Sequence, residues 1–463
     1  MLVPQVGRGR EQDAGPTLLG MEAVARRVAE LKPDTIIFIS PHGNMFRDAL
    51  AILDEPRLSG SFSRFGAGRV RYEKDTDIEL SNTVVEEFHV HGIPHVVLDE
   101  KQAKRYGVEA RLDHGVLVPM HFIDGQYGDY NIVHITPALL PHRDLYRAGH
   151  VIAKAVERVG RRALILASGD LAHCFEREGP PPEGSAYAVF DRALVDAMRR
   201  ADVPGVIDMD EKIYGPAQEC GLKSFCIALG ALDGYHVHTE VYSYESPFGV
   251  GYMCSRAWGE GAAGSLLESF EMESKMMVEK MRENEDAFIR LARESVEHFV
   301  RTGKHLDWDS YKGAAPKEFI QRVEKERAGA FVSLHWEGDL RGCIGTIAPT
   351  QEDLAHEIIH CAVEACSEDP RFDPVVEYEL SGLDVKVDIL GAPESIPDTS
   401  HLDPQKYGVI VQKGWKRGLL LPALEGVDTV EQQVSIACRK AGISDMSGIE
   451  LSRFIVERHE AHG

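Results

Sequence analysis

The sequence predicts a chain of two domains, an α/β three-layer sandwich over residues 1–258 and an α+β domain over residues 286–460. In the first domain, short apolar runs with the length of buried strands alternate with longer stretches of helical periodicity. Such alternation is typical of a sheet with helices on both faces. The expected strands are Thr35–Ile39, Asn131–Thr136 and Ala163–Ala167, and the expected helices cover 145–159 and 186–200.

The second domain is predicted to open on an amphipathic helix. Over residues 286–300 apolar side chains recur at helical spacing, which gives the helix one apolar face. Further on, runs at 385–390, 408–412 and 418–421 are expected to be strands among three or more helices. This mixture predicts an α+β domain rather than a second alternating one.

Residues 259–285 are expected to link the two domains. The stretch Gly259-Glu260-Gly261-Ala262-Ala263-Gly264 fits a dinucleotide-binding fingerprint and stands between a probable strand, 250–254, and a helix. However, it joins two domains and leads into the charged stretch 266–285. We therefore interpret it as a flexible hinge followed by a linker helix.

Composition and charge argue against several classes of function. The 463 residues carry a net charge of -23 at pH 7, which argues against non-specific binding to nucleic acid or to an anionic membrane. The eight cysteines form no Cys-x-x-Cys pair, and no secretory or membrane-spanning segment is visible in the sequence, so we expect a cytoplasmic protein. A Cys-x-x-x-Cys-x-x-Cys run is absent, so this chain does not itself carry a radical-SAM cluster.

Four residues suggest a metal-centred active site: His42, His114, His173 and Glu219. The three histidines lie in segments that we expect to be strands running into turns, namely 35–43, 112–120 and 163–173. In open α/β sheets ligands bind at such strand ends. Glu219 precedes the apolar run 225–229, and a buried glutamate is costly unless it is paired or bound to a metal.

The contexts Ser40-Pro41-His42-Gly43, Asp113-His114-Gly115, Ser168-Gly169-Asp170-Leu171-Ala172-His173 and Gln218-Glu219-Cys220-Gly221 together resemble the class III extradiol ring-cleavage dioxygenases, the LigB-type family that also contains the Memo proteins. The resemblance implies ferrous iron, or another divalent metal, held by two histidines and a glutamate, with open positions for oxygen and a catecholate. It matches His42 and Glu219 to metal ligands, His173 to an acid/base histidine and His114 to a histidine that touches the substrate. Asp170 either orients the imidazole of His173 or caps the following turn.

One residue of the family pattern has no counterpart. The family's first metal histidine lies on an opening strand ahead of a stretch like Leu2-Val3-Pro4-Gln5-Val6-Gly7, and the sequence has no histidine before His42. We therefore expect the natural protein to carry a further strand and a histidine upstream of Met1. The intact mass of the native protein tests this expectation.

The second domain resembles the AMMECR-type domain. The resemblance rests on Leu340-Arg341-Gly342-Cys343-Ile344-Gly345, on Asp369-Pro370-Arg371-Phe372-Asp373-Pro374-Val375 and on Gly418-Leu419-Leu420-Leu421-Pro422. Arg341 and Cys343 are a candidate site, because a cation beside a thiol can create a reactive nucleophile or a ligand. The alternative is a structural cysteine on a strand whose glycines permit close packing.

Two other histidine patterns imitate metal sites. His89, His91 and His95 are interpreted as the end of a helix passing into a strand at 94–98. His356-Glu357-Ile358-Ile359-His360 matches the zinc-protease signature on an expected helix over 351–365. No third ligand or protease framework accompanies it, so we do not interpret it as a protease.

Two functions from different classes follow from these resemblances. The first is an iron-dependent, dioxygenase-like oxidoreductase that acts on a small catechol-like or phenolic substrate. The second is a non-dioxygenase component of the AmmeMemoRadiSam system, in which AMMECR-type, Memo-type and radical-SAM proteins are thought to work together; a radical-SAM protein would then be the partner. A purely scaffolding protein would instead leave the four-residue site empty.

Overall fold

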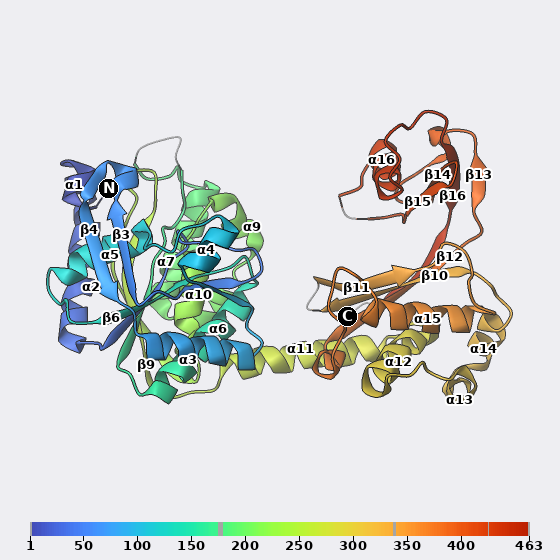
Figure 1. Ribbon diagram of the computed structural model, residues 1–463, viewed down its shortest axis with the longest axis horizontal. Coiled ribbons are helices and arrows are strands. Elements are labelled where there is room, and N and C mark those ends of the chain that lie inside the picture. The colour runs from blue at the N-terminus through green and yellow to red at the C-terminus, as the bar shows by residue number, and fades with distance from the viewer. Residues whose placement is uncertain (1, 175–178, 337–338, 425, 462–463) are drawn as a thin grey trace. The chain divides into compact units, whose positions relative to one another are not determined.

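The chain divides into two compact units, Met1–Phe270 and Glu271–Gly463, each with its own apolar core. Figure 1 labels their helices and strands. The structure is a computed structural model, and it describes residues 2–174, 179–336, 339–424 and 426–461.

Unit 1 combines a central sheet, two hairpins and ten helices among its described residues. Its strands are β1 (Thr35–Ile39), β2 (Leu50–Leu53), β3 (Arg57–Phe62), β4 (Ala67–Asp75), β5 (His95–Leu98), β6 (Asn131–Thr136), β7 (Ala163–Ala167), β8 (Tyr235–Glu245) and β9 (Tyr252–Ala262). Its helices are α1 (Pro4–Gly7), α2 (Gly15–Leu31), α3 (Ile78–Val90), α4 (Glu100–Tyr106), α5 (His114–Asp124), α6 (His142–Val159), α7 (Ala186–Arg200), α8 (Val203–Ile207), α9 (Glu211–Tyr214) and α10 (Leu222–Gly230). Short 3-10 turns lie at Arg10–Ala14, Ser63–Phe65 and Gly215–Ala217.

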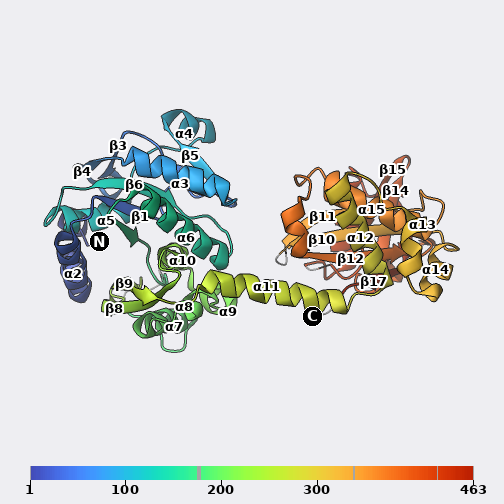
Figure 2. The same ribbon diagram turned by 90° about the horizontal axis from the view of Figure 1, so that it is seen from below.

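The central sheet has the strand order β5-β2-β6-β1-β7 and is parallel except between β2 and β6. Alternate side chains of β1 enter two separate apolar clusters. Ile37 and Ile39 pack with residues of α3, α6 and α10, whereas Ile36 and Phe38 pack with residues of α2 and α5. Helices therefore cover both faces of the sheet (Figure 2), as expected for an α/β domain.

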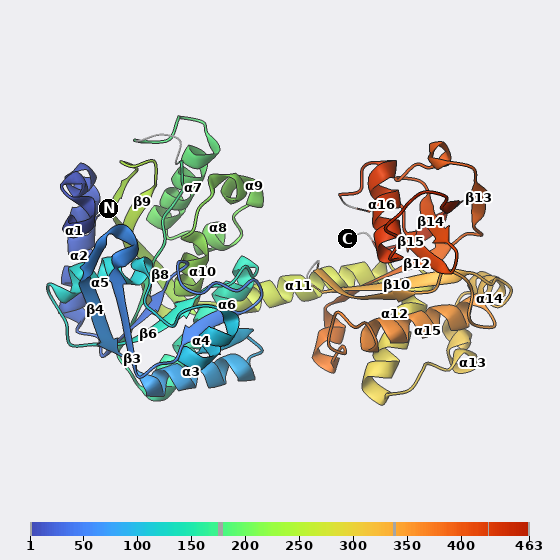
Figure 3. The same cartoon turned by 45° about the horizontal axis from the view of Figure 1, so that its top comes forward.

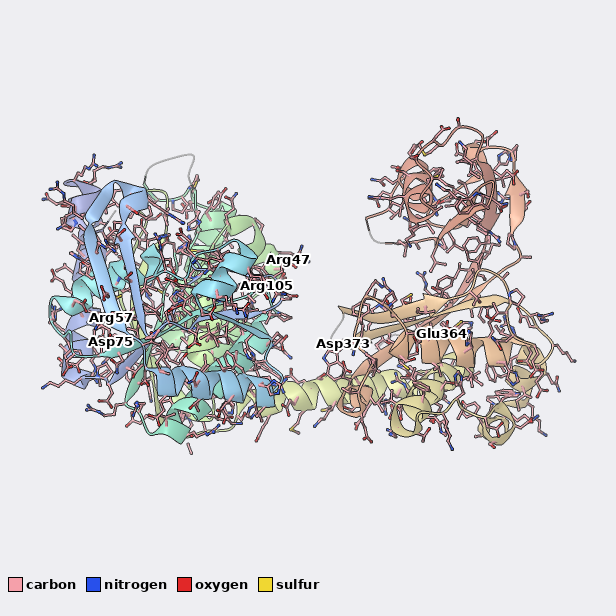
Figure 4. All side chains as sticks on the ribbon, viewed as in Figure 1. Arg47, Arg57, Asp75, Arg105, Glu364 and Asp373 are labelled. Atoms are coloured by element: carbon pink, nitrogen blue, oxygen red, sulfur yellow. The ribbon has the colours of Figure 1, made fainter. Side chains whose placement is uncertain are left out.

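The hairpins lie outside the central sheet. Strands β3 and β4 pair with each other, and Arg57 of β3 forms an ion pair with Asp75 of β4 at 2.6 Å (Figure 4). Both side chains are exposed, so this pair contributes little to stability. Strands β8 and β9 form the second antiparallel pair.

The expectation of a strand over 112–120 was wrong, because these residues begin helix α5. The Asp113 carboxylate caps the helix by accepting a hydrogen bond from the Gly115 amide at 2.7 Å. The apolar run that imitates a strand is instead largely buried in the helix, with Val116, Leu117 and Met120 in the core. Periodicity alone does not distinguish a buried strand from a short buried helix.

The expectation of a glycine-rich hinge was also wrong. Residues 259–262 are the end of β9, and Gly259 pairs with Val237 of β8. A Cβ atom at Gly259 would lie 2.7 Å from the Tyr235 side chain, so glycine is needed there for close cross-strand packing. Helix α11 (Leu266–Glu283) follows, and its first turn is held by Asp233, which accepts the Leu266 amide at 2.8 Å.

Unit 2 contains two antiparallel sheets, β11-β10-β12-β17 and β13-β16-β14-β15. Helices α12 and α15 pack against one face of the first sheet (Figure 3), and α16 packs against the second. The expected α+β class and the expected strands in this unit are confirmed. Its helices are α12 (Ala287–Thr302), α13 (Trp308–Tyr311), α14 (Lys317–Val323), α15 (Leu354–Ser367) and α16 (Val430–Lys440), with 3-10 turns at Lys312–Ala314, Glu377–Ser381 and Thr399–His401. Its strands are β10 (Gly329–Trp336), β11 (Asp339–Gly345), β12 (Leu383–Leu390), β13 (Glu394–Ile396), β14 (Gly408–Lys413), β15 (Lys416–Leu420), β16 (Glu450–Phe454) and β17 (Val456–His459).

Among the described residues, none of the helices combines the length and the apolar character that crossing a membrane requires.

Candidate functional site

The structure brings three of the four predicted site residues together at one end of the central sheet. His42 follows β1, and His114 begins α5. Their rings stack, with centroids 4.2 Å apart and planes at 26°. His173 lies in the segment after β7, the neighbour of β1, and its Nε2 atom is 3.8 Å from the thiol of Cys220.

The Cys220 thiol contacts both the segment after β1, which carries His42, and the segment after β7, which carries Asp170 and His173. Its sulfur lies 3.6 Å from His42 Nε2 and accepts a hydrogen bond from the Asp170 amide at 3.1 Å. Burial raises the pKa of this thiol to about 12, and the nearby Asp170 carboxylate adds to the effect. The thiol is therefore neutral near pH 7.

His42, Asp170 and Cys220 each offer one ligand atom, and these three atoms lie within 4.8 Å of one another. An imidazole, a carboxylate and a thiol together suit a divalent transition metal such as iron or zinc. The donor set therefore fits a metal ion, whose charge would favour release of the thiol proton. Cys220 was not among the site residues predicted from the sequence. Its position directly after Glu219, the expected ligand, in the Gln-Glu-Cys-Gly motif could have identified it.

Glu219, the predicted metal carboxylate, lies next to Cys220 in the chain but outside that group of three. One of its oxygens, Oε2, accepts the Leu222 amide at 2.7 Å at the start of α10. Burial raises the pKa of Glu219, while the Leu222 amide, Lys223 and His173 partly oppose this effect. A metal could still use the second oxygen, so the assignment of Glu219 as a ligand stays a prediction.

The loop that carries Asp170 and His173 is held by backbone contacts. Gly169 has a φ of 145°, and its Cβ position is filled by the backbone of Gly221, so only glycine fits there. The Asp170 carbonyl accepts the Gly221 amide at 2.9 Å. His173 Nε2 lies 3.7 Å from an Asp170 carboxylate oxygen, which is longer than a hydrogen bond.

The second predicted site, Arg341 and Cys343 on β11, is built differently. Arg341 forms a two-pronged ion pair with Glu379, at 2.7 and 3.0 Å, and also donates to the carbonyls of Asp373 and Pro374. The Cys343 thiol accepts a hydrogen bond from Ser333 at 3.2 Å. Through these contacts the guanidinium of Arg341 binds the segment from Asp373 to Glu379.

Cys343 also lies on the edge strand of its sheet, where backbone groups need partners. Its amide donates to Asp369 at 2.9 Å, and its carbonyl accepts from Arg371 at 3.2 Å. Asp369 and Arg371 are themselves paired at 2.7 Å, and this ion pair holds the pKa of Asp369 well below its usual range. The Asp369–Arg371 motif therefore contacts the Arg341–Cys343 motif by making the backbone hydrogen bonds that a further strand would make at this edge.

The zinc-protease signature on α15 has its carboxylate committed elsewhere. Glu357 is fully buried and accepts hydrogen bonds from both the hydroxyl and the amide of Thr350, from Thr346 and from the Gln351 amide. His360 pairs with Glu364 at 3.4 Å, and Glu364 lies on the same helix (Figure 4). Glu357 therefore anchors the loop before α15 and does not have the open position that a general base needs.

The group His89, His91 and His95 is explained by local structure. His91 ends α3 and its Nδ1 lies 3.0 Å from the Glu87 carbonyl, while His95 Nδ1 lies 2.8 Å from the Ile93 carbonyl. His89 is exposed on the last turn of α3. These residues serve the passage from helix to strand, as the sequence predicts.

Comparison with known proteins assigns both units. Residues 1–255 match the family model described as the catalytic LigB subunit of aromatic ring-opening dioxygenase, and residues 289–459 match the AMMECR1 model. Protein CA_C1420 of Clostridium acetobutylicum is 40% identical over 460 residues, which cover 99% of this chain and 97% of that protein. A protein of Thermotoga maritima is 51% identical over 178 residues, or 38% of this chain and 98% of its own length.

Among solved structures, the uncharacterized protein PH0010 from Pyrococcus horikoshii shares 30% identity and covers 38% of this chain and 90% of its own, with a TM-score of 0.34. The two family matches and the full-length relative agree with the residues that carry the resemblance in the sequence. The chain therefore belongs to the family of the catalytic LigB subunit of aromatic ring-opening dioxygenases, to which an AMMECR1 domain is joined.

Proposed function

We propose that unit 1 is a ferrous-iron-dependent, dioxygenase-like oxidoreductase that acts on a small catechol-like or phenolic molecule. The observation that carries the proposal is the convergence of His42, Asp170 and Cys220 within 4.8 Å, flanked by His114 and His173, in a domain of this family. When bound, iron would bring a phenolate and oxygen to adjacent coordination positions.

The two flanking histidines suit proton management and substrate contact. His173 lies 3.7 Å from an Asp170 carboxylate oxygen and could accept the proton of a phenolic hydroxyl. Burial, together with the neighbouring His42, lowers the pKa of His114, which favours a neutral imidazole that can hydrogen-bond a substrate. Phe65 meets the His114 ring edge-on with centroids 5.2 Å apart, which supports an aromatic substrate beside it.

A second candidate, a non-dioxygenase component of a radical-SAM-associated system, is favoured by one observation. Cys220 places a thiol within 4 Å of both His42 and His173. A thiol beside activated oxygen is exposed to oxidation, first to a sulfenic acid and then irreversibly. An ion held partly by sulfur also suits chemistry other than ring cleavage.

Anaerobic titration of the full chain with ferrous iron tests the proposal. We expect binding that is lost in His42→Ala, weakened in Cys220→Ser and in Glu219→Gln, and unchanged in His89→Ala, which removes an exposed imidazole of the same domain. The iron-loaded chain should then consume oxygen when catechol is added. Binding without oxygen consumption would favour the second candidate, and no binding would contradict both metal-based functions.

A further inference from the structure

We propose that Asp113 and His134 are positioning residues of the candidate site, which hold His42 and His114 in their stacked arrangement. The effect of this arrangement on metal binding rests on the proposed function. The hydrogen bonds that hold the two rings do not depend on a metal. Neither residue is among the candidate ligands. The Asp113 carboxylate joins the two elements that carry the stacked rings and ties both of them to the strand β6.

The hydrogen bonds of this carboxylate reach three separate elements. Its Oδ1 atom accepts the Ser40 hydroxyl at 2.6 Å and the Gly115 amide at 2.7 Å, and its Oδ2 atom lies 3.0 Å from His134 Nε2. Ser40 stands two residues before His42 and Asp113 directly precedes His114. The carboxylate therefore fixes the distance between the two backbones that carry the rings.

Two glycines make the arrangement tight. A Cβ atom at Gly43, the residue after His42, would collide with Thr136 and lie 3.0 Å from the His134 ring. A Cβ atom at Gly115, the residue after His114, would collide with Ser40 and lie 3.2 Å from the His42 ring. The segments carrying the two rings consequently interlock around the carboxylate without room for a larger side chain.

The protonation of the pair follows from its hydrogen bonds. Burial alone would raise the pKa of Asp113. The hydrogen bond from His134, charge attraction to the same imidazole, and the hydrogen bonds from Ser40 and the Gly115 amide outweigh burial and lower the pKa to about 2. An ionised carboxylate only accepts, so His134 Nε2 must carry a proton. Its Nδ1 atom is buried and has no partner among the described residues, so the imidazole is anchored at one atom only.

Energetics favour a geometric role for the pair. His134 is completely buried, and a buried carboxylate and imidazole together stabilise a fold little more than apolar residues of the same volume would. Such a pair does restrict orientation, because its short hydrogen bonds are directional. Partners of this kind behind metal-binding residues typically change metal affinity about 10-fold to 100-fold when removed.

The test compares Asp113→Asn with Asp77→Asn in the full chain, with Co²⁺ as the probe of the site. Asp77 is a matched control, because, like Asp113, it is a helix cap whose carboxylate accepts a hydrogen bond from a side chain of this domain, Thr35 at 2.5 Å. Its partner Thr35 begins β1, whereas Ser40, the partner of Asp113, follows the other end of that strand. Both variants should unfold more easily, but only Asp113→Asn should weaken Co²⁺ binding, by about tenfold or more.

Conservative replacement of the partner separates positioning from stability. Glutamine at position 134 can still donate a hydrogen bond to Asp113, whereas leucine cannot. We expect His134→Gln to retain Co²⁺ affinity within a few-fold and His134→Leu to lose it as Asp113→Asn does. Equal affinities in all the variants, with wild-type spectra of the bound Co²⁺, would overturn the proposal.

If the wild-type chain binds no Co²⁺, the proposed function fails and the positioning role is tested without metal. In protein with ¹³C-labelled histidine, the ring resonances of His42 and His114 carry the mutual shielding of stacked rings. Asp113→Asn should shift both resonances, and Asp77→Asn should leave both in place. Unchanged resonances in Asp113→Asn would contradict the inference independently of any metal chemistry.

Discussion

The candidate site in unit 1 and the Arg341–Cys343 motif in unit 2 are both clusters of reactive side chains, yet they use their polar groups differently. In unit 2, Arg341 gives its hydrogen bonds to Glu379 and to two carbonyls, and the edge at Cys343 is occupied by Asp369 and Arg371. In unit 1, His42 and His173 approach Cys220 only at 3.6 and 3.8 Å.

The difference is the one expected between a candidate binding site and a structural junction. Short, directional hydrogen bonds that occupy most of the donors of a side chain stabilise a fold but leave little capacity for a ligand. The contacts around the Cys220 thiol are longer, and the imidazole, carboxylate and thiol that meet there are groups that bind transition metals. Removing side chains should therefore change mainly the chemistry in unit 1 and mainly the stability in unit 2.

The largest expected effect concerns the reactivity of Cys220. Because its pKa is raised to about 12, only a minute fraction is thiolate at pH 7, and metal-free protein should react with iodoacetamide about a thousandfold more slowly at Cys220 than a free peptide thiol does. Mass spectrometry of time points gives the rate. Labelling as fast as that of a peptide thiol would mean that the histidines already stabilise the thiolate.

Replacement of Glu357 should have the largest effect on stability. Glu357→Ala leaves the donors of Thr346, Thr350 and Gln351 without their buried acceptor, so we expect a loss of about 4 kcal/mol in the free energy of unfolding. Urea denaturation followed by the fluorescence of unit 2 measures it. A small loss of stability together with zinc-dependent proteolysis would instead favour a zinc-protease site on α15.

Arg341→Met should destabilise unit 2 by about 3 kcal/mol, because it leaves the buried Glu379 carboxylate without its partner. Cys343→Ala, two residues away on the same strand, is the matched control and should change stability by no more than about 1 kcal/mol. The same denaturation experiment compares them. If Cys343→Ala proved the more damaging variant, Arg341 would not be the structural centre of this motif.

Asp113 should make the stability of unit 1 depend on pH. Its pKa is depressed to about 2 in the folded chain, against about 3.9 when unfolded, so its contribution of about 2 kcal/mol is fully present above pH 4 and is lost as the pH falls toward 2. The difference in the free energy of unfolding between the wild type and Asp113→Asn should therefore be smaller at pH 2.5 than at pH 6. Denaturant melts at both pH values measure the difference, and a constant difference would argue against an ionised Asp113.

Local sequence was sufficient to predict much of the secondary structure. The strands Thr35–Ile39, Asn131–Thr136 and Ala163–Ala167 and the helix Ala186–Arg200 have the predicted bounds, because each forms a continuous apolar or amphipathic run. The pattern of residues 112–120 predicts a strand where the chain begins helix α5, since a capped helix with an apolar face and a buried strand share the same composition. Likewise, the glycine pattern at 259–264 predicts a hinge where residues 259–262 end β9, because cross-strand packing against Tyr235 cannot be seen in a local pattern.

The sequence by itself determined the two domains and their families, because motifs of this kind lie within short contiguous stretches. It also predicted His42, His114, His173 and Glu219 as candidate site residues, and their roles stay predictions. Only the tertiary structure decided that Cys220 stands between His42 and His173, and that Asp113 reaches both Ser40 and His134. The physical reason is that the parallel sheet brings the ends of β1, β6 and β7 to a single edge, so residues far apart in the chain become neighbours. No local pattern records which of these residues meet.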